Sequence, residues 1–528
     1  MSRDGSRYAA PAPVVAPGWR IERITPPSRL YGANGLRGGP DGRLYVAQVA
    51  GSQISAVDPD SGAVEAFSPM GAGIVGPDDL CFDDRGNLYC AEFTEGRVSM
   101  RTPTGATRVI RGDVPASNPI SWHQGRLLCG ECRPGGRILE IDPHSGAERL
   151  LLADVPMPNA FEVGPDGKLY FPVMATGEIW RVDLDGGAPE VVAGGLATPD
   201  SVKFDADGMI VSTQFLSGEV LRIDPRDGAS SLLARIRPGL DNCALLGGRL
   251  FVSHIDGSIH EVGADGSSRP IVAGGLTWPM GIAWSDEGSL LVADGLFGFG
   301  WRPGEAMEQV GMQAVAGYPG FLRGVAAGGP GEWIVTTANG HLTRWWPAEQ
   351  RSETIREDLD QPIGVAPVGG GHAVAEHARG RVLLVTPQES LLLADGLDQP
   401  TGLAAASGAL IIAEAGAGRV LRLSGGRRET LLDGLGRPEG LACIDRTLFV
   451  LDVARKTLLA LPSTGGPARL VAENLPVGSP PGVPLQFLNG FGQFTGPLLR
   501  FAGLAAGQDG TLYIAADGEG SVLALRPA

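Results

Sequence analysis

Long apolar runs are missing from this sequence of 528 residues. No stretch approaches the roughly 18 apolar residues of a membrane-spanning helix, and the first residues, MSRDGSRYAAPAPVVAPG, lack the apolar core of a signal peptide. Positive charge is also scarce, because 43 Lys and Arg face 59 Asp and Glu and leave a net charge of -16. We therefore expect a cytoplasmic protein that binds neither membranes nor nucleic acid, whose phosphates attract Lys and Arg.

Cysteine and the common catalytic signatures are scarce as well. The six Cys are scattered along the chain, which is typical of reduced thiols in the cytoplasm. Cys129 and Cys132 form a CxxC, but zinc sites of this kind use a second pair, so we expect buried structural thiols. The chain has no GxSxG elbow, no HExxH motif and no Walker loop, which disfavours the enzymes that depend on them.

The abundant residues are Gly (80) and Pro (41), which fit many short strands joined by tight turns. One pattern recurs along the chain: a turn with Gly, an apolar strand, a polar turn and a second strand. Examples are GPDGRLYVAQVAGSQISAVDPDSG (39–62) and GPDGKLYFPVMATGEIWRVDLDGG (164–187), and strands such as ERLLLADVP (148–156) complete the unit. The units recur roughly every 38–48 residues and start near residues 33, 77, 118, 158, 199, 240, 279, 321, 362, 400, 438 and 501.

Twelve units of four strands predict an all-β fold of two tandem six-bladed β-propellers with antiparallel blades, because a single ring has four to eight blades. The last unit lacks a fourth strand, and WRIERITPP (19–27) resembles one. In the simplest arrangement a tail at 1–18 precedes propellers at 19–266 and 267–528, each closed by its own strands. In the alternative, the crossover lies near Trp278 and the N-terminal strand closes the second ring.

One position of the repeat differs between the two halves. The residue that starts the first strand of a blade, here called the first position, should lie at the mouth of the central channel. In the first six blades it reads Asn34, Asp78, Asn118, Asn159, Asp200 and Asp241, and in the last six Met280, Arg323, Ile363, Thr401, Glu439 and Ala502. A demand of the fold would affect both halves alike, so the Asn and Asp residues indicate a site in the first ring.

The residue that ends the second strand, here called the second position, should lie beside the first because the strands are antiparallel. In the first six blades it reads Gln48, Glu92, Glu131, Val173, Gln214 and His254. Carboxylates crowded at one mouth cannot all stay ionised without a counter-charge, and one divalent cation is the simplest solution. Oxygen ligands favour Ca²⁺, Mg²⁺ or Mn²⁺, while Zn²⁺ would use His254.

A structural role is the alternative for each single residue, because Asn and Asp side chains often bond to the backbone at strand starts. For the second-ring acids that follow the second strand we expect that role; they are Asp294, Glu376, Glu414 and Asp452. His377 and Arg323 leave a second site open. The segment 476–497 interrupts the repeat and is a lid, a plug or a surface loop.

The blade pattern resembles NHL repeats, and the first half resembles the regucalcin/gluconolactonase (SMP-30) lactonase family. In that family one divalent cation is held by a Glu of the first blade, an Asn and an Asp, and another Asn helps to bind the substrate. The matching residues here are Asn159 in MPNAFEV, Asp200 in TPDSVKF and Asn118 one blade earlier. Asn34 stands where the family has its Glu, so Glu92 or Glu131 supplies the charge, the metal is held differently, or there is none. Asn34 followed by Asp78 matches the family's order equally well.

The resemblance implies a metal-dependent hydrolase that opens a lactone, with a small-molecule substrate and Ca²⁺ as the favoured ion. The expected roles are catalysis for Asp200, His254 and Glu92, substrate binding for Asn118, Asn34, Gln214 and Gln48, and metal binding for Asn159, Asp200, Asp78, Asp241 and Glu131. Two alternatives remain open. One is a metal-dependent lyase that resembles streptogramin lyase and opens a cyclic ester by elimination; the other is a non-catalytic binding scaffold.

Overall fold

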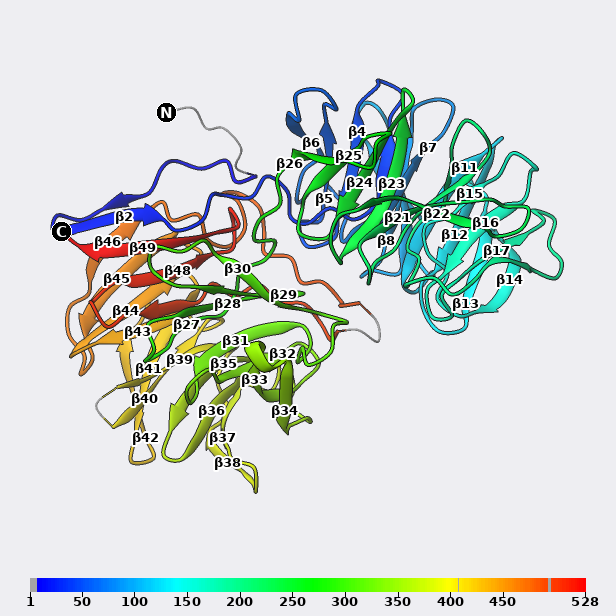
Figure 1. The fold of residues 1–528 in the computed structure, drawn as a ribbon. Coiled ribbons are helices and arrows are strands. Elements are labelled where there is room, and N and C mark those ends of the chain that lie inside the picture. Colours follow the sequence, from blue (N-terminus) through cyan, green and yellow to red (C-terminus); the bar gives the residue numbers. More distant parts are fainter. Residues whose placement is uncertain (1–6, 407, 492–494) are drawn as a thin grey trace. The chain divides into compact units, whose positions relative to one another are not determined.

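The computed structural model describes residues 7–406, 408–491 and 495–528. Within these ranges the one helix is a 3₁₀ turn, Pro347–Glu349, and no helix could cross a membrane. The strands form twelve antiparallel sheets of four strands, one of which gains a short fifth strand (Figure 1). Glycine makes the hairpins possible: Gly42, in the turn before β4 (Leu44–Gln48), has a φ of 79°, which side chains rarely adopt.

The chain divides into two compact units. The first, here called the first ring, comprises residues 28–275 together with Phe491. Its six sheets run from an inner to an outer strand as follows: β3 (Leu36–Gly38) to β6 (Val64–Ser68), β7 (Pro77–Phe82) to β10 (Thr107–Arg111), β11 (Ser117–His123) to β14 (Glu148–Val155), β15 (Glu162–Val163) to β18 (Glu190–Ala193), β19 (Lys203–Phe204) to β22 (Ser230–Arg235), and β23 (Leu240–Leu246) to β26 (Ser268–Val272).

The second ring comprises the remaining described residues. Five of its sheets run from β27 (Ile282–Trp284) to β30 (Glu308–Met312), β31 (Leu322–Ala327) to β34 (Arg351–Arg356), β35 (Pro362–Val368) to β38 (Ser390–Ala394), β39 (Pro400–Ala406) to β42 (Arg427–Leu432), and β43 (Pro438–Ile444) to β46 (Arg469–Glu473). The sixth contains β47 (Leu504–Ala506), β48 (Leu512–Ala516), β49 (Ser521–Pro527) and β2 (Trp19–Arg23).

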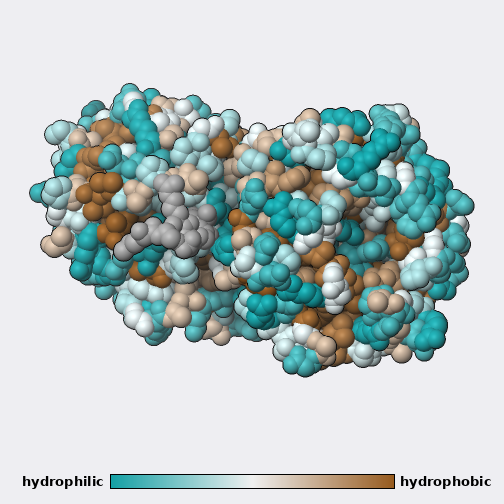
Figure 2. Space-filling view, turned by 90° about the horizontal axis from the view of Figure 1, so that it is seen from above, coloured by the Kyte–Doolittle hydropathy of each residue, from teal (hydrophilic) through white to brown (hydrophobic). Residues whose placement is uncertain are grey.

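A hydrophobic core between neighbouring sheets closes each ring. In the first ring Leu36 and Val46 of the first sheet pack with Phe251 of the sixth. In the second ring Val292 of the first sheet packs with Tyr513 of the sixth. Burying one such side chain contributes roughly 1.5–3 kcal/mol, so these cores hold the sheets together as the blades of a β-propeller are held. On the face drawn in Figure 2, hydrophobic residues form patches that are separated by hydrophilic residues.

The N-terminal segment belongs to the second ring, which corrects the expected boundaries. β2 pairs with β49 from Trp19 opposite Pro527 to Arg23 opposite Leu523, and the blue and red strands lie side by side in Figure 1. Residues 7–18 are not simply a tail, because β1 (Val14–Val15) pairs with β46. The described strands thus divide at other residues than 19–266 and 267–528, and they match the alternative in which the N-terminal strand closes the second ring. Without β2 the backbone of β49 would present an unpaired edge, whereas residues 28–275 contain all six sheets of the first ring.

This closure predicts how fragments behave. We expect residues 28–275, expressed alone, to fold into a monomer with a cooperative thermal transition. We expect residues 276–528 to aggregate, because they leave β49 unpaired, and residues 1–27 supplied as a peptide to rescue them. Circular dichroism and size-exclusion chromatography check both expectations, and a stable, monomeric 276–528 fragment would contradict the assigned closure.

Candidate functional site

The first-position residues of neighbouring sheets meet at the axis of each ring. In the first ring the Gly35 N–H donates to the Asp78 carbonyl at 2.6 Å, and in the second ring the Gly281 N–H donates to the Arg323 carbonyl at 2.7 Å. Six glycines follow the first position in the second ring: Gly281, Gly324, Gly364, Gly402, Gly440 and Gly503. A Cβ on any of them would lie at most 2.8 Å from a first-position carbonyl of the next sheet. This close approach brings the six first positions together around one channel.

Three aspartates share the channel mouth of the first ring. Asp78 and Asp241 lie in the inner strands β7 and β23, and Asp200 lies just before the inner strand β19. Asp78 is 7% exposed and Asp200 is 4% exposed, while Asp241 is partly buried. Burial and then repulsion by Asp79 raise the pKa of Asp78 to about 7. Burial and then repulsion by Asp78 raise the pKa of Asp200 well above its usual range. Burial and repulsion by Asp200 and Asp78 do the same for the pKa of Asp241.

The amide side chains at this mouth are used to different extents. The Asn34 amide donates to Asp241 at 3.2 Å, and its oxygen accepts from the Val49 N–H at 3.2 Å. The Asn159 amide donates to the Met174 sulfur at 3.0 Å, and its oxygen accepts from the Ala160 N–H. In the described part of the chain, no protein hydrogen bond reaches the side chains of Asp78, Asn118 or Asp200, so their oxygens are available to a ligand.

No preformed metal cluster accompanies these residues. Among the described residues, no three His, Cys, Asp or Glu side chains are grouped as metal ligands are. The donor set nevertheless suits a divalent cation, because buried carboxylates that repel one another are stabilised when a cation neutralises them. Three carboxylates and neighbouring amide oxygens are the ligands of a hard cation such as Ca²⁺ or Mg²⁺ rather than of Zn²⁺.

Two glutamates expected at the mouth form ion pairs within their own blades instead. Glu92, fully buried, accepts from the Val75 N–H at 2.7 Å and pairs with Arg97 at 2.6 Å. Glu131, also fully buried, pairs with Arg133 at 2.8 Å and with Arg137 at 2.5 Å. Their charges are therefore already neutralised, and the expectation that they serve as a catalytic group and a metal ligand is not supported by their contacts.

The remaining polar second positions are held in a similar way. Gln48 accepts from the Tyr31 N–H at 2.9 Å and donates to Ser55 at 2.8 Å. The Gln214 amide donates to Ser212 at 3.0 Å. One ring nitrogen of His254 lies 2.7 Å from the Pro238 carbonyl, and the other lies 2.8 Å from Asp256. These contacts occupy Gln48 and both ring nitrogens of His254, whereas the Gln214 oxygen has no hydrogen-bond partner among the described residues.

The strand register explains why these second positions do not join the mouth. Glu92 is paired with Pro77, the residue before Asp78, and His254 is paired with Leu240, the residue before Asp241. Successive side chains of a strand leave opposite faces of its sheet, and a shift of one residue moves a side chain to the other face. The strands pair antiparallel as expected, but their register differs by one residue from the expected one.

In the second ring, acids at the second position make the same hydrogen bonds and ion pairs, as its sequence predicted. Glu376 accepts from the Asp360 N–H at 2.7 Å and pairs with Arg381, and Glu414 accepts from the Asp398 N–H at 2.8 Å and pairs with Arg419. An Arg five residues after the Glu is thus a signal of this structural pair. That signal is also present in the first ring, in Glu92 and Arg97, and could have identified the role of Glu92.

Sequence reasoning missed side chains that follow the second positions. Cys132 comes directly after Glu131 and is 5% exposed. Burial, then the charges of Asp78, Asp200 and Asp241, raise the pKa of its thiol well above its usual range, which places the thiol near these aspartates. Met174 lies against Asn159 at the equivalent position of the next blade. The mouth therefore has an apolar side as well as an acidic one. All six cysteines are free thiols, and Cys129 and Cys132 are buried, as expected.

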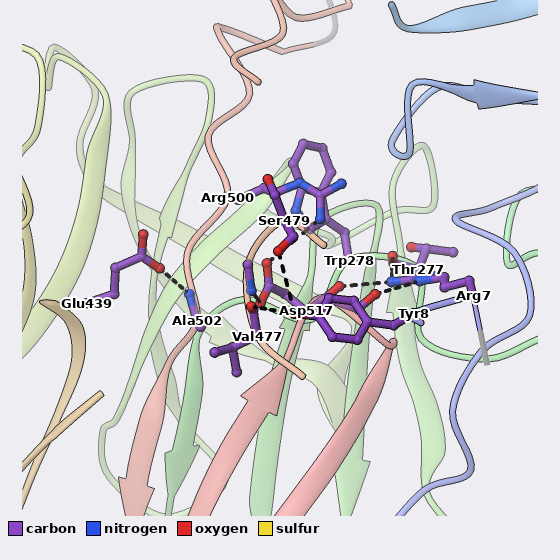
Figure 3. A network of polar contacts seen from close by, with 12 residues as sticks. Arg7, Tyr8, Thr277, Trp278, Glu439, Val477, Ser479, Arg500, Ala502 and Asp517 are labelled. Atoms are coloured by element: carbon purple, nitrogen blue, oxygen red, sulfur yellow. Dashed lines mark hydrogen bonds and ion pairs between the residues drawn. The ribbon is translucent and has the colours of Figure 1, made fainter. Parts of the chain in front are cut away.

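The corresponding mouth of the second ring is filled by its own chain. The Glu439 carboxylate accepts from the Ala502 N–H at 2.8 Å and pairs with Arg437 at 2.8 Å. Figure 3 shows Arg500 beside the Trp278 ring. The Arg500 guanidinium lies 5.4 Å from the ring centroid and 3.9 Å from the Asp517 carboxylate. Asp517 also accepts from the Gly478 N–H at 2.6 Å. This part of the 476–497 insertion is therefore packed into the second ring, and Arg323 bonds to the Pro497 carbonyl.

The raised pKa values predict a stability that falls with rising pH. A carboxyl whose folded pKa exceeds its unfolded pKa of about 3.9 holds its proton longer in the folded state. Without divalent cations, stability should therefore fall as pH rises from about 4 through about 7, the folded pKa of Asp78. We expect Asp78→Asn to reduce this loss of stability by a few kcal/mol. Thermal midpoints measured across this pH range in EDTA check the expectation. An unchanged pH profile in Asp78→Asn would contradict the assigned burial.

The ion pairs predict that Glu92 stabilises the fold without binding metal. Glu92→Gln should lower the free energy of unfolding by about 3 kcal/mol, because it leaves Arg97 without its buried partner. The matched control is Glu376→Gln in the second ring, for which we expect a similar loss. Chemical denaturation measures both effects, and calorimetric titration with CaCl₂ should show equal affinities in all three proteins. Loss of calcium binding in Glu92→Gln alone would contradict this expectation and show that Glu92 binds the metal at the channel mouth.

The chain shows distant similarity to several solved structures. They include virginiamycin B lyase from Staphylococcus aureus and the calcium-binding protein regucalcin from Agrobacterium tumefaciens. The lyase is 16% identical over 52% of this chain and 96% of its own, with a TM-score of 0.39. Regucalcin is 23% identical over 44% of this chain and 85% of its own, with a TM-score of 0.36. A putative gluconolactonase is 17% identical over 49% of this chain and 95% of its own, with a TM-score of 0.38.

Identities this low say nothing about the roles of residues. No curated protein matches the chain in sequence. The family model described as SMP-30/Gluconolactonase/LRE-like region matches residues 123–255, which lie within the first ring. The resemblance of the first half to the SMP-30/gluconolactonase family is thereby confirmed for that segment.

Proposed function

We propose that the chain forms two tandem six-bladed β-propellers and that the first ring is a metal-dependent hydrolase that opens a lactone. The observation that carries the proposal is the meeting of Asp78, Asp200 and Asp241 at one channel mouth. These aspartates have raised pKa values and repel one another. A protein that keeps three such carboxylates together loses stability unless a cation neutralises them, so binding of a cation is the simplest use of the arrangement.

One divalent cation would be held by Asp200, Asp78 and Asp241 with the amide oxygens of Asn118 and Asn159. Such an ion, when bound, polarises an ester carbonyl and lowers the pKa of a coordinated water. Calcium is favoured, because its larger and more flexible coordination shell tolerates ligands that come from separate strands.

The residues of the mouth would then orient the ester and move one proton. Asp200 would take a proton from the water that adds to the carbonyl carbon and return it to the ring oxygen as the ring C–O bond breaks. The Asn118 amide, which makes no hydrogen bond within the described residues, would donate to the substrate. Cys132 and Met174 would cover the apolar part of the lactone. The product is one hydroxy acid, which contains all the atoms of the lactone and of one water.

Replacement of Asp200 tests the proposal. Asp200→Asn keeps the shape of the side chain and removes its charge, so we expect calcium affinity to fall about tenfold or more, by the loss of one charged ligand. Hydrolysis across a panel of lactones should fall by at least 100-fold, because the proposed base is lost as well. The control is Asp207→Asn in the same blade, whose side chain is 80% exposed, and it should behave as the wild-type protein does. Full metal content and full activity in Asp200→Asn would exclude this site.

The two alternatives give different results in the same assay. If the reaction is carried out in H₂¹⁸O, hydrolysis places one ¹⁸O in the product carboxylate, whereas elimination by a lyase places none. A non-catalytic scaffold binds no metal and changes no lactone. Mass spectrometry of the products therefore separates the hydrolase from both alternatives.

A further inference from the structure

A second cluster of charged side chains lies at the other end of the first-ring channel. Arg37, Ser121, Glu162 and Lys203 each follow a first-position residue by three places in the chain. At about 3.3 Å per residue along a strand, they are separated from the aspartates of the mouth by roughly 10 Å. Arg37, Ser121 and Glu162 line a cavity of about 190 Å³, formed by the ends of the inner strands β3, β7, β11 and β15.

Lys203 is the least satisfied member of this cluster. Its side chain is 5% exposed, and its ammonium group has no hydrogen-bond partner among the described residues. The nearest opposite charge is the Glu162 carboxylate, whose Oε2 lies 3.6 Å from Nζ. Burial and then repulsion by Arg37 lower the pKa of Lys203. A buried ammonium without hydrogen bonds is costly, and it gains most from an oxygen that accepts its protons.

Arg37 lies at a similar distance from the same carboxylate oxygen and does not hydrogen-bond to it. Its guanidinium donates to the Leu80 carbonyl at 3.1 Å and to the Ile120 carbonyl at 3.3 Å. Its Nη1 lies 3.6 Å from Glu162 Oε2, beyond the range of a direct hydrogen bond. Polar groups at such a distance are often bridged by a third group.

Glu162 has the opposite requirement. Its Oε2 is buried and accepts no hydrogen bond within the described residues. A ligand that donates a hydrogen bond would satisfy it. The other nearby acid, Asp79, is already satisfied: it accepts from the N–H groups of Leu80 at 2.8 Å and Ile120 at 3.2 Å, and from the Asn242 amide at 3.3 Å. The groups without hydrogen-bond partners are thus Lys203 Nζ and Glu162 Oε2. Glu162 and Arg37 line the small cavity, and Lys203 lies 3.6 Å from the same carboxylate oxygen.

We propose that this end of the channel is a binding site for a small hydroxy acid. The carboxylate of the ligand accepts hydrogen bonds from Lys203 and Arg37, and a hydroxyl of the ligand donates to Glu162. A carboxylate alone leaves Glu162 unsatisfied, and a neutral alcohol alone leaves Lys203 without a counter-charge. This site does not involve the acidic mouth, and the inference stands without the proposed lactonase activity.

Calorimetric titration of the full chain with sodium glycolate tests the site. EDTA is included so that no metal at the acidic mouth can bind the probe, and ionic strength is held constant. We expect saturable glycolate binding, weaker binding of acetate, and weaker binding still of ethylene glycol. Lys203→Met should weaken glycolate binding at least tenfold, as expected for the loss of a charge-assisted hydrogen bond. The control Lys168→Met removes a lysine that is 26% exposed and pairs with Asp183, and it should change the affinity less than twofold.

Glu162→Gln distinguishes the hydroxyl contact from the carboxylate contact. This variant should reduce the preference for glycolate over acetate while both still bind. The chain has three lysines, Lys168, Lys203 and Lys456, so labelling with an amine reagent, followed by mass spectrometry, gives a second readout in the wild-type protein. Glycolate should slow the labelling of Lys203 alone. Absence of glycolate binding, equal binding in Lys203→Met, or equal labelling with and without glycolate would overturn the proposal, and equal affinities for acetate and glycolate would overturn the hydroxyl contact.

Discussion

The close approach of inner strands at the axis of each ring is the constraint on which the rest of the structure depends. In the second ring every blade places a glycine against a first-position carbonyl of the next blade. In the first ring the same contact joins Gly35 to Asp78. Because the backbones touch there, the side chains one residue earlier have no freedom to spread apart. Whatever residue type stands at the first position is concentrated sixfold at the channel mouth.

Much of this arrangement could be predicted from the sequence, because it repeats. Twelve similar units indicated twelve sheets, and the contrast between Asp200 or Asp241 and their second-ring counterparts indicated where the rings differ. Two features were not settled in this way. Ring closure depends on a pairing between residues some 500 positions apart, so the sequence left two alternatives for the ring that the N-terminal strand closes. The facing of Glu92 and His254 depends on a bulge-shifted register, where one residue decides which face a side chain takes.

The two rings share a scaffold and differ in what their mouths hold. The acid that ends the second strand ties a loop to its blade in both rings, as Glu92 and Glu376 show. The first positions are free to vary because that tie does not involve them. In the first ring they gather repelling carboxylates, while in the second ring Arg323 and Glu439 are bonded to the chain itself. A hydroxy acid, proposed at the far end of the first-ring channel, is also the class of product that lactone opening would release.

The pairing of β2 with β49 has a consequence for the order in which the protein assembles during synthesis. The first ring can close once residue 275 has left the ribosome, because all its strands lie between residues 28 and 275. The strand Trp19–Arg23 is made before them, yet its partner ends at Pro527. The strand Trp19–Arg23 must therefore wait, unpaired, until its partner has been synthesised. Its alternating charges, in Arg20, Glu22 and Arg23, suit a strand that has to stay soluble during that interval.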